Sequence, residues 1–442
     1  MNDSLFNRID LLVVPPVMVI IIIFLGILKK KQPAEIQKYF FGAFYLRILG
    51  TLSISAIIEF YYAAGDSYSY YFNAQALRQL FFDDPKTWLQ VMCSNSESGT
   101  PAVSHYVDII GNYDQYSALL YKSINYNATV CKIASLFNLI CFNSSIGIAL
   151  FFGLLSFLGC WYIFKTFVYI FPGYEKNYAL LCLFLPSLWF WGSGILKDPL
   201  CMFALGILVY HLFVKKRSFL KRGILICLGA FLLLNIKPYI FYSFCVASLG
   251  GWGIYQFKRF GFAGKLALLV LFAGMLVFLY PVIANTTSKF YDDMLKESQT
   301  YIKNYTDYAQ EGSSNIIRTI DPTPMGFFIL SMQGFVTVYM RPFPWELNKV
   351  LYIFLILENL LIYYIIFKKV KTGPLNFRKN YRLLNNFSFI YFIFLGLIIG
   401  ITAFNLGTIA RYRVPALPFL FAGIFSLKLI KRKKRQERLL IL

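Results

Sequence analysis

Charged residues and histidines are both scarce in this chain. Only 14% of its 442 residues are charged and two are histidine, whereas about a quarter of a soluble domain is charged. Two histidines without a His-Glu-x-x-His spacing do not indicate a zinc hydrolase. The chain also lacks a Walker-type phosphate loop and a Ser–His–acid arrangement that can be placed on one face. These absences argue against direct ATP hydrolysis and against serine-hydrolase chemistry.

The eight cysteines do not have the spacing of a metal site. Five lie in or beside apolar runs, where they are expected to act as small apolar residues: Cys160, Cys182, Cys201, Cys227 and Cys245. Cys93, Cys131 and Cys141 fall in one hydrophilic region, and a disulfide between two of them stays open if that region is extracytoplasmic. No cleavable signal peptide is recognisable, because basic residues and no small-residue cleavage site follow the first apolar run.

Long apolar runs recur along the whole chain, which is 58% hydrophobic and 19% aromatic. A helix needs about 20 apolar residues to cross a bilayer. The sequence therefore predicts an all-α polytopic membrane protein with about 11 transmembrane helices. The expected spans are 10–28, 41–62, 144–166, 177–193, 197–213, 222–236, 238–256, 264–284, 346–367, 387–405 and 411–430.

The formal net charge of +22 follows from basic clusters at the ends of apolar runs. These clusters are at 29–32, 215–222, 368–371 and 431–435. Such placement is typical of cytoplasmic loops, so nucleic acid is not needed as a partner. It predicts an outside N-terminus, a cytoplasmic C-terminus and an odd number of crossings, in a bacterial inner (cytoplasmic) membrane. To keep that parity, segment 325–340 is expected to lie at, or dip into, the outer surface.

This topology leaves two large extracytoplasmic loops, at 63–143 and 285–345. It divides the chain into an extra N-terminal helix with a basic link (1–40), a transmembrane domain (41–430) and a basic cytoplasmic tail (431–442). Loops of this size on one face place recognition or chemistry there. No internal or inverted repeat is visible, which weighs modestly against a transporter.

A carboxylate, Asp66, follows the second apolar run in the stretch GDSYSYY, and Glu59 lies within that run. Ionisable groups at membrane depth are costly, so each suggests a function. Asp66 is either an interfacial carboxylate in a helix-ending turn or a base or metal ligand at the mouth of a bundle. Tyr68, Tyr70 and Tyr71 form either an interfacial aromatic belt or a platform for a sugar ring.

Lys197 and Asp198 lie in the short outer link PSLWFWGSGILKDPL, on the same predicted surface as Asp66. Such a short link does not require charged residues. Asp198 could simply stabilise the positive end of the helix that follows. The functional alternative is a second carboxylate of an outer-face site.

Arginines also lie on the outer face, against the positive-inside tendency. Arg411 and Arg413 begin the last predicted helix, and Arg341 lies in the stretch YMRPFPWE. Guanidinium groups match phosphate oxygens, so a phosphate or pyrophosphate head group is the expected partner. The alternative is contact with ordinary lipid head groups. Glu358 and Asn359 are expected to satisfy each other or a neighbouring helix.

The order of these features resembles the GT-C class of membrane glycosyltransferases, which use polyprenyl-phosphate-linked sugars. Members of that class have an acid in the first outer loop and another in the second. Asp66 in GDSYSYY and Asp198 in LKDPL match these positions. An Arg- and Pro-rich helix start near the lipid phosphate is similar to RYRVPALP at 411–418, and the resemblance covers roughly 41–430.

The resemblance implies sugar transfer from a polyprenyl-phosphate donor to a glycan or lipid acceptor on the extracytoplasmic face, in cell-envelope glycan synthesis. Asp66 would be the base, while Asp198 would bind hydroxyls or share a divalent metal (Mg or Mn) with Asp66. Glu59, Tyr68, Tyr70 and Tyr71 would contact substrate. The segment 285–325 would act as a lid. The expected phosphate ligands are Arg411, Arg413, Arg341 and Lys197.

Three other classes remain open from the sequence. A repeat-unit polymerase or O-antigen ligase-like enzyme would share the outer-face site and would depend more on Arg341 and Arg411 than on Asp66. A transporter for an anionic lipid or solute would have polar residues along a route through the midplane. A non-catalytic assembly factor would not need the interfacial acids.

Overall fold

The described part of the chain is helical throughout. The computed structural model describes residues 4–62, 65–96, 99–123, 125–214, 218–257, 261, 264, 324–346, 350–367, 381–403 and 406–420. All regular elements in these ranges are helices. The chain divides into two compact units, Met1–Phe241 and Tyr242–Leu442, each described here by itself. Residues 265–323, which contain nearly all of the expected helix at 264–284 and of the lid at 285–325, and the basic tail lie outside the described residues.

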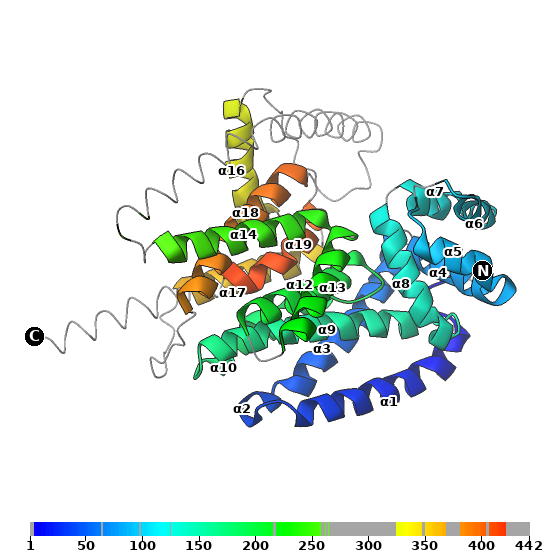
Figure 1. Cartoon of the computed structure of the whole chain (residues 1–442), viewed down its shortest axis with the longest axis horizontal. Coiled ribbons are helices and arrows are strands. Elements are labelled where there is room, and N and C mark those ends of the chain that lie inside the picture. Colours follow the sequence, from blue (N-terminus) through cyan, green and yellow to red (C-terminus); the bar gives the residue numbers. More distant parts are fainter. Residues whose placement is uncertain are drawn as a thin grey trace, which may run out of the picture. The chain divides into compact units, whose positions relative to one another are not determined.

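The first unit is built on long helices. The elements that frame it are α1 (Arg8–Lys30), α2 (Ala34–Gln37), α3 (Phe40–Ile57) with its π-helical extension η1 (Ile58–Tyr62), α9 (Ser145–Ile170), α12 (Lys197–Phe213) and α13 (Phe219–Leu234). Helix α9 packs against α1, α3 and α12 (Figure 1). A side chain on Gly159 of α9 would meet the backbone of Met202 on α12, so these two helices approach through small residues, as membrane helices commonly do.

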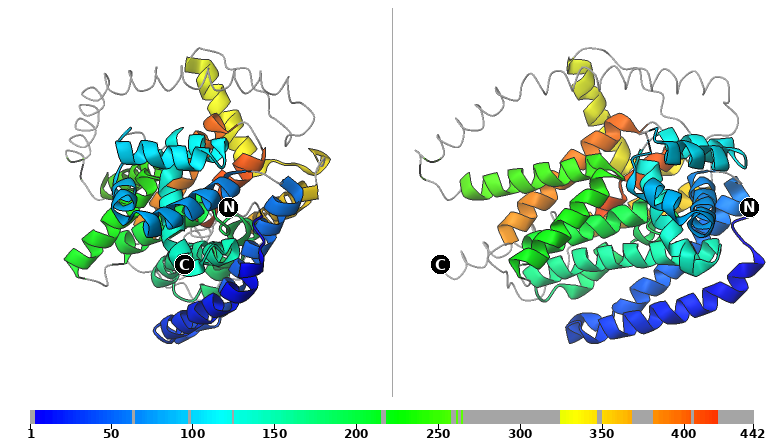
Figure 2. Two further views of the ribbon diagram at one scale, coloured as in Figure 1. Left: turned by 90° about the vertical axis from the view of Figure 1, so that its right-hand side faces the viewer. Right: turned by 45° about the vertical axis from the view of Figure 1, so that its right-hand side comes forward.

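The expected outer loop at 63–143 is a set of five helices: α4 (Asp66–Asp83), α5 (Pro85–Cys93), α6 (Pro101–Gly111), α7 (Gln115–Ser123) and α8 (Asn125–Cys141). Local capping explains where two of the shorter helices begin. Asp84 accepts a hydrogen bond from the Thr87 N–H ahead of α5, and Thr100 accepts one from the Val103 N–H ahead of α6. These helices gather beside the start of α9 (Figure 2).

Four described helices are long and apolar enough to cross a membrane: Arg8–Lys30, Ala34–Tyr62, Ser145–Ile170 and Tyr381–Thr402. Helix α1 buries Val17, Ile21 and Leu25 on one face, while Leu11 and Leu12 on the other are 79% and 78% exposed. A long exposed apolar face is costly in water and is expected where lipid covers it. Several apolar helices thus suggest a membrane protein, while the total of about 11 spans stays a prediction.

The expected span at 177–193 is broken into short pieces. It forms α10 (Glu175–Ala179), η2 (Leu180–Phe184) and α11 (Pro186–Phe190), followed by an irregular turn. Pro186 explains the break, because proline has no N–H to continue a helix and disfavours helical backbone in the residue before it. The turn that follows leads directly into α12.

The second unit contains most of α14 (Pro238–Phe257) together with α16 (Pro324–Met340), η3 (Pro344–Glu346), α17 (Val350–Phe367), α18 (Tyr381–Thr402), α19 (Leu406–Tyr412) and η4 (Val414–Ala416). The segment expected at the outer surface, 325–340, is an apolar helix packed along α18. Its Gly334 meets the backbone of Gly400, and this close approach requires both residues to lack a side chain.

Candidate functional site

A buried ion pair lies at the start of α12. The Nζ atom of Lys237 donates to Oδ1 of Asp198 over 2.6 Å, and the two residues are 4% and 0% exposed. Asp198 lies in the first turn of α12, and Lys237 immediately precedes α14. Burying two charges is tolerated only when each has a partner. Sequence reasoning missed Lys237, although a lysine between two apolar runs was the available signal.

Asp66 begins α4 and lies close to the same turn. The Ser67 hydroxyl donates to the Ile195 carbonyl over 3.0 Å, which holds the start of α4 two residues from Lys197. The charges of Asp66 and Lys197 interact, and both side chains are half-buried. The structure thus brings together three residues that the sequence placed on one surface: Asp66, Lys197 and Asp198.

Tyr116 on α7 lies near Asp66 as well. Partial burial and then the negative charge of Asp66 raise the pKa of the Tyr116 hydroxyl. Within the described residues, no hydrogen bond or ion pair occupies the Asp66 carboxylate. By contrast, Lys237 already neutralises Asp198. Asp66 is therefore the better placed of the two acids to accept a proton.

Arg47 of α3 fixes the turn that carries these residues. Its guanidinium is buried and donates to the Leu188 carbonyl, to the Gly192 carbonyl over 3.4 Å and to the Cys160 sulfur over 2.9 Å. Gly194 adopts a positive φ of +79°, where a side chain would also meet Ile54. Sequence reasoning missed Arg47, because its oxygen partners are backbone carbonyls that no pattern marks.

Glu59 and Tyr68 tie down the N-terminal segment. The Glu59 carboxylate accepts hydrogen bonds from the Ser4 hydroxyl over 2.6 Å, from the Leu5 N–H over 2.9 Å and from the Tyr68 hydroxyl. These two predicted substrate contacts are therefore engaged by the chain itself. The structure gives them a role in anchoring the start of α1 to η1 and α4.

Tyr70 and Tyr71 are core residues. Both are 0% exposed. The Tyr70 hydroxyl donates to Asn127 Oδ1 over 3.1 Å, and that of Tyr71 donates to the Asn143 carbonyl over 2.7 Å. The prediction of a sugar platform here needs correction, because a sugar ring cannot stack on rings that are already covered by packing.

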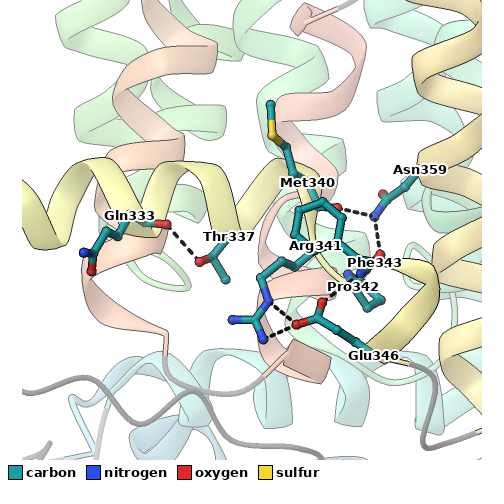
Figure 3. Close-up of polar contacts among 8 residues, drawn as sticks. All are labelled: Gln333, Thr337, Met340, Arg341, Pro342, Phe343, Glu346 and Asn359. Carbon is teal, nitrogen blue, oxygen red and sulfur yellow. Dashed lines mark hydrogen bonds and ion pairs between the residues drawn. The ribbon is translucent and has the colours of Figure 1, made fainter.

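The arginines predicted for the outer face belong to the second unit, and two of them have carboxylate partners. Arg413 is buried and pairs with Glu358 over 3.5 Å. Arg341 Nε donates to Glu346 Oε1 over 2.7 Å (Figure 3). Arg411 is a half-buried residue of α19. Two of the arginines that are expected to bind phosphate are therefore already neutralised by carboxylates of the chain.

The Arg341–Glu346 turn is closed by further hydrogen bonds. The Phe343 N–H donates to Glu346 Oε2 over 2.8 Å, and Asn359 Nδ2 donates to the Met340 and Pro342 carbonyls over 3.2 and 3.4 Å (Figure 3). The packing role predicted for Asn359 is confirmed, with backbone carbonyls as partners. Glu358 pairs with Arg413, which directly follows α19, so its predicted contact with a neighbouring element is confirmed as well.

Acid should weaken this turn. Burial alone would raise the pKa of the Glu346 carboxyl, but the hydrogen bonds from Arg341 and Phe343 outweigh it and hold the pKa below 4.5. A lowered folded-state pKa adds stability above pH 4.5 that disappears as the pH falls through the folded-state value. Glu346→Gln should therefore lower the free energy of unfolding at pH 7 by about 1 kcal/mol or less, and the difference from wild type should shrink as the pH falls below 4.5. A difference that does not change between pH 7 and pH 3 would contradict this.

A divalent metal shared by Asp66 and Asp198 does not fit the geometry, because the Lys237 ammonium already occupies Asp198 at 2.6 Å. Across the described ranges, no cluster of three or more His, Cys, Asp or Glu side chains could hold a metal ion. The three cysteines of the α5–α8 region are free thiols, and Cys131 and Cys141 are buried on α8.

Comparison with protein-family models, curated proteins and solved structures found no match for this chain. The described part of the chain is all-helical, and its apolar helices suggest a membrane protein. Asp66, Lys197 and the buried Asp198–Lys237 pair lie where α4 meets the turn before α12.

Proposed function

We propose that the protein is an integral membrane glycosyltransferase that moves a sugar from a polyprenyl-phosphate donor to an acceptor on the extracytoplasmic face. The observation that carries the proposal is the meeting of Asp66 with Lys197 and Asp198, held by the hydrogen bond from Ser67 to Ile195. The resemblance of the GDSYSYY and LKDPL stretches to the GT-C class supports the same reaction. This resemblance concerns only the order of the acidic residues along the chain, so the proposed reaction depends on the residues themselves.

In this reaction Asp66 accepts the proton of the acceptor hydroxyl. The acceptor oxygen then bonds to the anomeric carbon of the sugar, and the bond from that carbon to the lipid phosphate oxygen breaks. The phosphate leaves with the electron pair. Lys197, a half-buried cation whose charge interacts with those of Asp66 and Asp198, stabilises that developing charge.

The Asp198–Lys237 pair has a positioning role in this mechanism. Its two buried charges fix the first turn of α12 against the start of α14 and so set the direction of Lys197. Arg47 holds the other end of the same turn. Arg411 stays a predicted phosphate ligand in the second unit, to be tested by its own variant.

The test is a thermal-shift and transfer assay on the full chain in nanodiscs. Polyprenyl-phosphate sugars should raise the melting temperature, since a ligand that binds only the folded state stabilises it. Lys197→Gln and Arg411→Ala should reduce the shift, and Asp66→Asn should keep it. A product ladder of repeat units, with stabilisation by pyrophosphate-linked glycans alone, would support the polymerase or ligase alternative. No stabilisation by either lipid class would overturn the proposal.

A further inference from the structure

A polar cavity lies in the first unit, away from Asp66. Its volume is about 540 Å³, and it is bounded by α4, the end of α6, the turn before α9 and the start of α1. Sites for small ligands typically span about 300–1,000 Å³. Gln75 lies nine residues beyond Asp66, which places it about 14 Å along α4 and on the opposite side of the helix. The cavity is therefore distinct from the proposed reaction site.

One face of α4 supplies most of the recognition groups. Gln75, Arg78, Gln79 and Phe82 all line the cavity. Their spacing of i, i+3, i+4 and i+7 puts them on a single helical stripe. The sequence signal was therefore present in SYYFNAQALRQLFFD, although a polar stripe alone is equally typical of a solvated helix face.

Two of these side chains have buried polar atoms without a partner. Gln75 is 6% exposed and its Oε1 accepts no hydrogen bond from the described residues, while the Arg78 Nε is buried and equally unpaired. Buried polar atoms are normally satisfied, so two unsatisfied atoms on residues that line one cavity point to a ligand. Gln75 Oε1 requires a donor, and Arg78 Nε requires an acceptor.

The surroundings of Arg78 suit the binding of an anion. Its guanidinium lies 5.1 Å from the centre of the Phe82 ring and 5.7 Å from that of Phe142. Across the described ranges no carboxylate forms an ion pair with it. Aromatic neighbours fix the plane of the guanidinium and leave its donor edge available for a carboxylate or phosphate.

The rest of the lining favours a hydroxyl-rich ligand over a simple anion. Gln79, Asn143 and the Asp83 carboxylate share the cavity with Arg78. A bare phosphate would meet repulsion from Asp83 and would leave Gln75 Oε1 unsatisfied. Sugar hydroxyls donate to both groups, and the apolar C–H faces of a sugar can pack on Phe82 or Tyr113.

We propose that this cavity binds an acidic oligosaccharide, with the sugar carboxylate on Arg78 and sugar hydroxyls on Gln75 and Asp83. The choice of a glycan rests on the proposed function, whereas the site itself rests on the cavity and its unpaired groups. It would hold a segment of the acceptor glycan away from the reacting end. The enzyme would thereby favour acceptors that carry negatively charged sugars.

The test is calorimetric binding to the full chain in phosphatidylcholine nanodiscs. The probes are a galacturonic acid trisaccharide, neutral maltotriose and inorganic phosphate. We expect the acidic trisaccharide to bind at least about tenfold more tightly than the other two. Arg78→Gln should weaken it at least about tenfold, and Arg78→Lys should weaken it less, because lysine keeps the charge without the fork of donors.

Two control variants test whether binding depends on this cavity rather than on the overall charge of the protein or on the proposed reaction site. Lys86→Gln removes one positive charge from an exposed residue of the neighbouring α5, and Asp66→Asn alters the proposed base. Both should bind the acidic trisaccharide within about threefold of wild type. Wild-type protein that binds it but transfers no sugar would preserve the cavity proposal and overturn the proposed function.

Four outcomes would overturn the cavity proposal. These are no binding of the acidic trisaccharide, equal binding by maltotriose, full displacement by an equal concentration of phosphate, and unchanged affinity in Arg78→Gln. Loss of binding in nanodiscs that contain phosphatidylglycerol would assign the site to an anionic lipid head group instead.

Discussion

Asp66→Asn is expected to lower the rate of sugar transfer by about 10²–10⁴-fold, the contribution typical of a positioned general base. Asparagine has nearly the same size but cannot accept the acceptor proton. Asp66 is half-buried and no described residue donates a hydrogen bond to it. Its structural contribution is limited to that of an acid in the first turn of α4, worth about 0.3–1 kcal/mol. The measurement is single-turnover transfer alongside the melting temperature.

Asp84→Asn provides a matched control for that experiment. Asp84 is an exposed acid in the same helical layer, where it caps α5, and asparagine caps a helix about as well as aspartate. The control should keep both wild-type turnover and wild-type stability. Asp66→Asn protein that expresses normally and retains half of the wild-type rate would show that another group is the base.

The long helices were the most predictable part of the fold. The expected span 197–213 coincides with α12 (Lys197–Phe213), and the expected 10–28 lies within α1 (Arg8–Lys30). In both cases a continuous apolar run ends at charged or polar residues, so hydropathy alone marks the bounds. The same reasoning overlooked the break at Pro186, because the run 177–193 is apolar throughout and hydropathy gives no weight to backbone geometry.

The helices of the α4–α8 layer could not be read from hydropathy. Three of them, α5, α6 and α7, are only 9 to 11 residues long, and isolated helices of that length owe most of their stability to packing. Tyr70 and Tyr71 illustrate the consequence. In the sequence they resemble an exposed aromatic cluster, but the packing of α4 on α8 buries both of them.

The candidate site was predictable only in part. The acids Asp66 and Asp198 could be singled out because carboxylates are costly near lipid. Their partners could not. Lys237 lies 39 residues from Asp198 in sequence. No periodic sequence pattern predicts that a residue before α14 pairs with one in the first turn of α12. Long-range pairing of this kind depends on tertiary packing.

Lys237→Met tests that pairing and should cost about 3–5 kcal/mol of folding stability. Methionine fills a similar volume, so the main change is that the fully buried Asp198 carboxylate loses the Lys237 ammonium. Lys122→Met is the matched control, since Lys122 is an exposed residue of α7 and its replacement should change stability by no more than about 0.5 kcal/mol. The measurement is equilibrium unfolding in detergent, and a loss below 1 kcal/mol in Lys237→Met would show that Asp198 does not depend on this lysine.

The double variant Asp198→Asn, Lys237→Met then separates positioning from chemistry. Removing both charges should recover much of the stability, because no unpaired buried charge remains. If transfer recovers with stability, the pair acts only by setting the turn before α12. If stability returns while transfer stays low, the Asp198 carboxylate takes a direct part in the reaction, and the assignment of Asp66 as the sole acid of the site has to be given up.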